Sequence, residues 1–207
     1  MCRLGKYFKR DIELFSSKRD MGDMGRPRKF SREGVLQKAL PVFWKYGFAR
    51  TSLPDLERAT GVNKSGLYSE FESKEELFLA CLRYYLDNRS GGACLSTEPL
   101  GWDNIQKFLE EAPSCTLDQR GCFSVNSMRE LTGLPPEARK LIIDSRTKLK
   151  RLLKANIAAE NPKMDVDVVC DLVSVFFSGI CIEANLNTNQ SRSRRKIENF
   201  MQMLRAA

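Results

Sequence analysis

Apolar residues recur at three- and four-residue steps along most of the chain, and this spacing predicts amphipathic α-helices. The first such segment runs from Ser31, a suitable N-cap, to Tyr46, and Gly47 follows as its end. Its inward face carries Val35, Leu36, Ala39, Leu40 and Phe43. Because a proline inside a helix removes one backbone hydrogen bond, the pattern also predicts a bend at Pro41.

Two short helices and one longer helix are predicted next, each opened by a capping signal. Ser52-Leu53-Pro54-Asp55 is a capping box, and the helix that it opens ends at Gly61. Asn63 caps a second short helix over residues 64–71. Ser73-Lys74-Glu75-Glu76 is another capping box and opens the longer helix. Because only a three-residue turn joins the two short helices, we interpret them as a helix-turn-helix.

Five further helices are predicted in the rest of the chain. They cover about residues 103–111, 125–131, 137–161, 165–187 and 192–206. No alternating strand pattern competes with them, so the predicted fold class is all-α. We divide the chain into a flexible N-terminal arm (1–23), a three-helix module that contains the helix-turn-helix (24–74) and a larger helical domain (75–207).

The composition argues against several classes of enzyme. The 207 residues include no histidine, which excludes a Ser-His-Asp or Cys-His nucleophile and a histidine-ligated catalytic zinc. Both common glycine-rich phosphate loops are absent from the sequence, and its seven cysteines form no C-x-x-C pair. We therefore expect a protein that is not an enzyme and has no metal or cofactor. Since the sequence also carries no signal peptide and no apolar stretch long enough for a bilayer, we expect a cytoplasmic location.

Positive charge is concentrated in the small module. The chain has a formal net charge of +8, and residues 24–74 hold ten basic residues against five acidic ones. Residues 91–207 hold sixteen basic against fourteen acidic residues, a net charge of +2. Such an excess on one small module is typical of a surface that faces the phosphates of a nucleic acid.

The motifs of residues 30–85 resemble those of a known family. They are Lys45-Tyr46-Gly47-Phe48, Thr51-Ser52, the run from Gly61 to Tyr68, Phe71, and Ser73-Lys74-Glu75-Glu76-Leu77-Phe78. In this order and spacing they are similar to the N-terminal DNA-binding module of TetR-type (TetR/AcrR) transcriptional regulators. The resemblance implies a helix-turn-helix DNA-binding domain followed by a helical domain for effector binding and dimerisation.

The resemblance also implies which residues contact DNA. Thr51, Ser52, Tyr68 and Lys74 would bind phosphates, while Lys64 and Ser65 would lie nearest the base edges. The full predicted set is Arg26, Arg28, Lys29, Thr51, Ser52, Asn63, Lys64, Ser65, Gly66, Tyr68 and Lys74. Its first three members form a basic arm that could reach a minor groove, and Gly66 would let the backbone approach DNA. Glu70 departs from the family pattern and brings a negative charge toward the phosphates.

In such regulators the larger domain forms a pocket and a dimer interface. The predicted pocket residues are Trp102, Phe108, Cys122, Phe123, Met128 and Leu131. The predicted interface residues are Val169, Leu172, Val173, Phe176, Phe177, Ile180, Ile197, Phe200, Met201 and Leu204. Both sets have an alternative interpretation as ordinary core within one chain. The segment around Cys122 is similar to one TetR subgroup with cysteine sensors, so Cys122 and Cys115 are candidate sensors of electrophiles, although free cysteines are more often buried.

The resulting hypothesis is a bacterial, nucleoid-associated regulator. It would be a homodimeric repressor that a small-molecule or electrophile effector releases from a palindromic double-stranded DNA operator, with no membrane partner. Two alternatives stay open at this point. One is an architectural protein that binds nucleic acid without sequence preference, and the other is a small-molecule-binding thiol enzyme with an accessory helix-turn-helix.

Overall fold

The computed structural model describes residues 30–88, 92–111, 121–186 and 190–206, and these segments are helical without any strand. The α-helices are α1 (Arg32–Arg50), α2 (Leu53–Thr60), α3 (Lys64–Glu70), α4 (Lys74–Asn88), α5 (Trp102–Glu111), α6 (Phe123–Ser127), α7 (Pro136–Ala159), α8 (Val166–Glu183) and α9 (Gln190–Ala206). Short 3₁₀ turns are η1 (Cys94–Ser96), η2 (Met128–Gly133) and η3 (Ala184–Leu186). Within these segments, no helix combines the length and the hydropathy that a membrane crossing requires.

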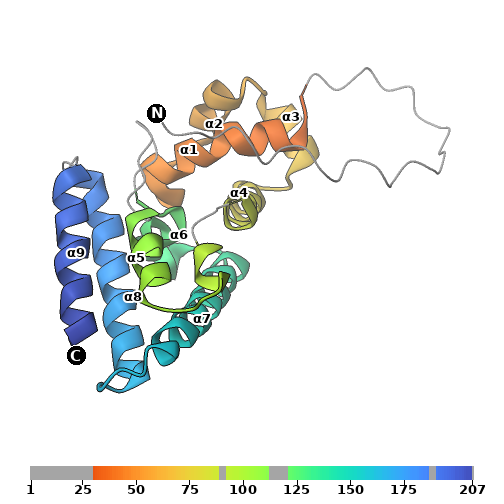
Figure 1. Ribbon diagram of the computed structural model, residues 1–207. Coiled ribbons are helices and arrows are strands. Elements are labelled where there is room, and N and C mark those ends of the chain that lie inside the picture. The colour runs from red at the N-terminus through yellow and green to blue at the C-terminus, as the bar shows by residue number, and fades with distance from the viewer. Residues whose placement is uncertain (1–29, 89–91, 112–120, 187–189, 207) are drawn as a thin grey trace.

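The first hydrophobic core lies among α1, α2, α3 and α4 and includes residues of α6 and of the start of α7, and α1 to α3 occupy one end of the molecule (Figure 1). The five predicted inward residues of α1 are all buried in it. Backbone angles stay helical at Pro41, so the helix is not broken there, and the non-helical residue inside α1 is Gly47 (φ 78°, ψ 175°). The regular helix therefore ends at Gly47, as predicted, because a glycine adopts a positive φ at little cost.

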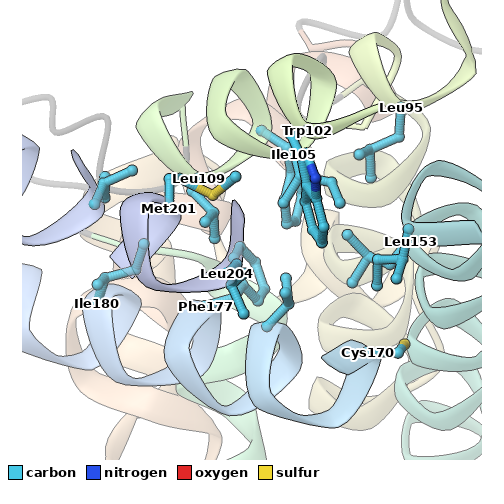
Figure 2. Close-up of a cluster of buried hydrophobic side chains, with 14 of the residues drawn as sticks. Leu95, Trp102, Ile105, Leu109, Leu153, Cys170, Phe177, Ile180, Met201 and Leu204 are labelled. Atoms are coloured by element: carbon cyan, nitrogen blue, oxygen red, sulfur yellow. The ribbon is translucent and has the colours of Figure 1, made fainter. Parts of the chain in front are cut away.

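The second core is built by α5, α7, α8 and α9, at the other end of the molecule (Figure 1). Figure 2 shows side chains of α5, such as Trp102 and Leu109, lying among those of α8 and α9, such as Phe177 and Met201. Seven of the predicted dimer-interface residues are buried here within one chain: Val169, Val173, Phe177, Ile180, Ile197, Met201 and Leu204. The dimer prediction is corrected at these positions, because α8 and α9 need an apolar face to pack against their own domain.

Helix α6 lies between the two cores. Phe123 belongs to the first core, where its ring contacts Trp44, Phe78 and Tyr85 at centroid distances of 5.5, 5.7 and 5.8 Å. Cys122 and Val125, on either side of it in the sequence, belong to the second core. A displacement of this short helix would therefore change the packing of both cores.

Candidate nucleic-acid interface and effector cavity

The start of α2 is fixed by the capping box that the sequence predicts. The Ser52 hydroxyl accepts a hydrogen bond from the Asp55 backbone N–H at 3.4 Å, and the Asp55 carboxylate accepts one from the Ser52 N–H at 3.1 Å. The Ser52 hydroxyl also donates to the Asp55 carboxylate at 2.5 Å, and this bond, together with the one from the Ser52 N–H, lowers the pKa of Asp55. At the other end, Gly61 takes the left-handed conformation (φ 73°) that ends α2 and directs the chain into α3.

Helix α3 presents polar side chains outward and apolar ones inward. Lys64 and Ser65 are exposed, and Tyr68 keeps 42% of its surface open to solvent, while Leu67 is buried. The Lys64 ammonium lies 5.8 Å from the centre of the Tyr68 ring. The Lys64 backbone N–H donates to the Glu57 carboxylate of α2, which holds the two helices of the motif together. The surface expected to read DNA is thus free of intrachain packing on its outer side.

Two further predicted residues set the backbone at the start of α3. The Asn63 side chain accepts a hydrogen bond from the Gly66 N–H at 2.9 Å, which is the predicted cap. A Cβ atom on Gly66 would come within 2.6 Å of the Val62 side chain, which is buried. The sequence interpretation assigned this glycine to close approach by DNA, whereas the structure supplies a packing reason.

Thr51 and Lys74 are turned toward the protein. Thr51 is 1% exposed, and its hydroxyl donates to the Gly47 carbonyl at 2.6 Å. The Lys74 ammonium donates to the Phe48 and Thr51 carbonyls, both at 3.1 Å, and lies 4.4 Å from the centre of the Phe48 ring. In this structure both groups stabilise the turn between α1 and α2, and the phosphate contacts predicted for these two side chains stay predictions.

Replacing Lys74 with methionine is expected to lower the free energy of unfolding by about 1.5 kcal/mol, the low end for hydrogen bonds to a charged group. Methionine keeps most of the apolar stem but cannot bond to the two carbonyls. Urea denaturation measures the change, with Lys163→Met as the control, since Lys163 is exposed in the larger domain. Unchanged stability together with a weaker salt dependence of DNA binding would instead support the phosphate contact.

Arg32 is a structural residue that the sequence analysis missed. Its guanidinium lies 4.1 Å from the centre of the Phe71 ring, donates to the Glu70 carbonyl, and pairs with the Glu76 carboxylate at 3.2 Å. It thereby joins α1 to the end of α3 and the start of α4. No spacing in the sequence singles it out, because its partners lie at least 38 residues away. The predicted basic arm, Arg26, Arg28 and Lys29, lies outside the described residues.

A cavity of about 550 Å³ opens among α4, α6, α7 and α8. Its apolar lining includes Leu86, Val125, Leu141, Leu149, Leu152 and Phe177. Of the six predicted pocket residues, Cys122 alone lines it. Trp102 and Phe108 are buried in the second core, and Phe123, Met128 and Leu131 pack with the first. The pocket prediction is corrected for this cavity at Trp102, Phe108, Met128 and Leu131, which pack against a core, whereas Phe123 packs in the first core and also lines a second cleft.

Cys122 is a buried residue and not an exposed thiol. It is 3% exposed, and the Tyr85 hydroxyl lies 3.3 Å from its sulfur. The candidate Cys115 lies outside the described residues. No group of three or more metal-binding side chains gathers in the parts of the chain that the structure describes.

A second cleft, of about 680 Å³, lies between the end of α1 and the segment of α6, η2 and η3. At its side the Glu130 carboxylate accepts a hydrogen bond from the Ala49 backbone N–H at 2.9 Å. Glu130 also occupies the space beside Gly47, where a Cβ atom would stand 1.8 Å from a carboxylate oxygen. Turn η2 of the larger domain is therefore linked directly to the last turn of α1, just before α2.

An exposed apolar stripe runs along α8. Val168, Leu172, Val175 and Ile182 are 49%, 44%, 72% and 43% exposed, and they recur at steps of three, four and seven residues. Next to it, Phe176 stacks on Phe200 of α9 at a centroid distance of 3.9 Å. Leu172, Phe176 and Phe200 are the predicted interface residues that keep some exposure. Contiguous apolar surface of this kind marks an interaction site.

Comparisons with known proteins agree with this architecture. A family model described as bacterial regulatory proteins, tetR family, matches residues 35–81. The HTH-type transcriptional repressor ComR of Escherichia coli is 27% identical over 185 residues, covering 86% of this chain and 88% of ComR. The HTH-type transcriptional repressor BdcR of the same organism is 25% identical over 163 residues, covering 77% of this chain and 82% of BdcR.

Solved structures point the same way. A cysteine mutant of the TetR family transcriptional regulator CifR, complexed with 26-base-pair double-strand operator DNA, superposes with a TM-score of 0.74. It is 26% identical and covers 86% of this chain and 98% of the CifR chain. With the capped helix-turn-helix, the exposed outer face of α3 and a helical second domain, these matches show that the chain belongs to the TetR family of DNA-binding, helix-turn-helix transcriptional regulators.

Proposed function

We propose that the protein is a homodimeric repressor that binds a palindromic operator and leaves it when a small molecule occupies the cavity among α4, α6, α7 and α8. The observation that carries the DNA-binding part is the outer face of α3, where Lys64, Ser65 and Tyr68 are exposed on a helix fixed at both ends. A helix of this kind fits the major groove of B-DNA, where side chains can reach base edges.

The contacts divide into two kinds. Lys64 and Ser65, at the N-terminal end of α3, would reach base edges, and Tyr68 and Ser52 would bind phosphates on either side of the groove. Thr51 and Lys74 would act indirectly by holding the turn that carries Ser52. This division predicts that variants of Lys64 and Ser65 change sequence preference. Variants of Tyr68 and Ser52 should instead weaken binding to every sequence.

Replacing Lys64 with methionine is expected to weaken binding to the preferred operator about tenfold, the order of magnitude for one specific base contact. Binding to random DNA should fall much less, because only one phosphate-attracting charge is lost. Fluorescence polarisation at fixed salt measures both affinities. Lys163→Met, which removes one exposed charge from the larger domain, is the matched control. Equal losses on operator and random DNA would support the architectural alternative, in which the protein binds without sequence preference.

The exposed stripe of α8 supports the dimer. In a two-fold assembly the same patch of both copies meets, so an apolar stripe on one chain would cover its own counterpart. Phe200 and Met203 of α9 extend the apolar surface beside it, and Met203 is 66% exposed. A dimer would place its two α3 helices at half-sites about 34–36 Å apart, or at a multiple of that distance.

Release by an effector would pass through α6. Cys122, Ser124 and Val125 line the cavity, while Phe123 between them is embedded in the core of the DNA-binding module. Turn η2 follows α6 directly, and its Glu130 holds the end of α1 through the Ala49 N–H. A ligand that moves α6 would shift α1 and thereby the spacing of the two α3 helices. By linkage, operator DNA would weaken effector binding by the same factor.

A further inference from the structure

One charged side chain in the lining of the effector cavity differs from the others in its solvent exposure. Arg146 of α7 is partly buried, whereas the other charged residues of the lining, Asp87, Asp144 and Lys148, are exposed. Water and salt screen the exposed charges strongly and the partly buried guanidinium less. The electrostatic preference of the inner cavity is therefore set by Arg146.

The partners of Arg146 are neutral. One guanidinium nitrogen lies 3.4 Å from the Met128 sulfur of η2 and 3.5 Å from the Ser178 hydroxyl of α8. That hydroxyl already donates to the Ser174 carbonyl at 2.9 Å. Among the residues that the structure describes, no carboxylate pairs with Arg146. A guanidinium has five N–H donors, and within the described residues only one of its nitrogens has a partner, so donors remain for a ligand.

Much of the remaining lining is apolar, beside the exposed charged residues and the serines Ser96, Ser124 and Ser145. Leucines of α4 and α7 and Phe177 of α8 provide the walls, and the volume of about 550 Å³ lies within the range of small-molecule sites, roughly 300–1,000 Å³. An apolar wall with one partly desolvated cation is complementary to a molecule with an apolar body and a single negative end. A neutral apolar molecule would leave the guanidinium without a counter-ion, which is costly in a low-dielectric site.

We propose that the effector is an amphipathic organic anion whose acidic group binds Arg146 and whose apolar body lies against the leucine walls. This inference rests on the proposed function, because it assigns the ligand class of the same cavity. The acidic group would compete with Met128 and Ser178 for the guanidinium. Since Met128 begins η2, whose Glu130 holds α1, that competition gives the ligand a route to the DNA-binding module.

Calorimetric titration of the full chain with octanoate, octan-1-ol and octylammonium tests the ligand class without DNA. At constant ionic strength and pH 7, we expect octanoate to bind about tenfold more tightly than the alcohol, since the carboxylate forms a charge-assisted hydrogen bond with Arg146 and the alcohol does not. The octylammonium ion should bind more weakly than either. Equal affinities, a preference for the alcohol, or no octanoate binding at millimolar concentration would overturn the proposal.

Variants separate recognition of the anion from a structural role of Arg146. In Arg146→Met the preference for octanoate over the alcohol should disappear while the alcohol affinity stays the same. Arg146→Lys should recover part of the preference, and Lys163→Met, which removes an exposed charge outside the cavity, should keep all of it. If Arg146→Met retains the octanoate preference, the proposal is wrong. Operator release is measured separately, so octanoate that binds without releasing DNA contradicts the release mechanism alone.

Discussion

Replacing Phe123 with alanine is expected to lower the free energy of unfolding by about 3–5 kcal/mol. The side chain is 1% exposed and touches three aromatic rings of α1 and α4, so its removal leaves a cavity that rigid neighbours cannot fill. The residue comes from α6, which also lines the cavity proposed to bind the effector. Its loss should therefore weaken the connection between the two cores as well as the first core itself.

Urea denaturation followed by circular dichroism and tryptophan fluorescence measures both effects. Phe108→Ala is the matched control, since Phe108 is equally buried but stacks on Phe177 inside the second core, at a centroid distance of 4.7 Å. Both variants should lose stability, and Phe123→Ala alone should show transitions of the two probes that no longer coincide. If the free energy of unfolding of Phe123→Ala lies within about 1 kcal/mol of wild type, the residue is not buried as described, because small changes of this size are typical of surface substitutions.

Introducing glutamate at Val175 is expected to produce a folded monomer whose operator affinity falls by at least about a hundredfold. Val175 is the most exposed residue of the α8 stripe, so the change costs little within one chain. In a two-fold interface each substitution occurs twice, and two carboxylates would be forced together in an apolar contact. Juxtaposed like charges cost several kcal/mol, enough to dissociate the assembly.

Analytical ultracentrifugation and operator titration of the same samples give the two readouts. Ile143→Glu is the control, because Ile143 is an apolar residue of α7 that is 53% exposed and lies outside the stripe. The Ile143→Glu protein should remain dimeric and bind operator DNA with wild-type affinity. A Val175→Glu protein that stays dimeric would show that the copies associate through another surface.

The sequence predicted best what depends on neighbours close in the chain. Caps at Ser31, Ser52 and Asn63 and the glycine end of α2 are local hydrogen-bond and backbone effects, and the structure confirms them. Five predicted helices of the second half also match observed ones to within a few residues, apart from the division of one into α6 and η2. These features follow from periodicity and capping alone.

Features that depend on partners distant in the chain were not predictable. Helix α8 is apolar on more than one face, and no pattern says which face packs within the chain and which stays exposed. Val173 is buried and Val175 is 72% exposed, although they are two residues apart and chemically identical. In the same way, the inward turn of Lys74 and the neutral surroundings of Arg146 depend on contacts with other helices.

Selection of bound sequences from random DNA by the purified protein tests the central claim, that two copies of α3 enter successive major grooves of one operator. We predict enrichment of a palindrome with half-sites about 10 base pairs apart, centre to centre, or a multiple of that spacing. The outer bases of the consensus should change when Lys64 or Ser65 is replaced. Uniform recovery of all sequences, or a consensus without two-fold symmetry, would contradict the account.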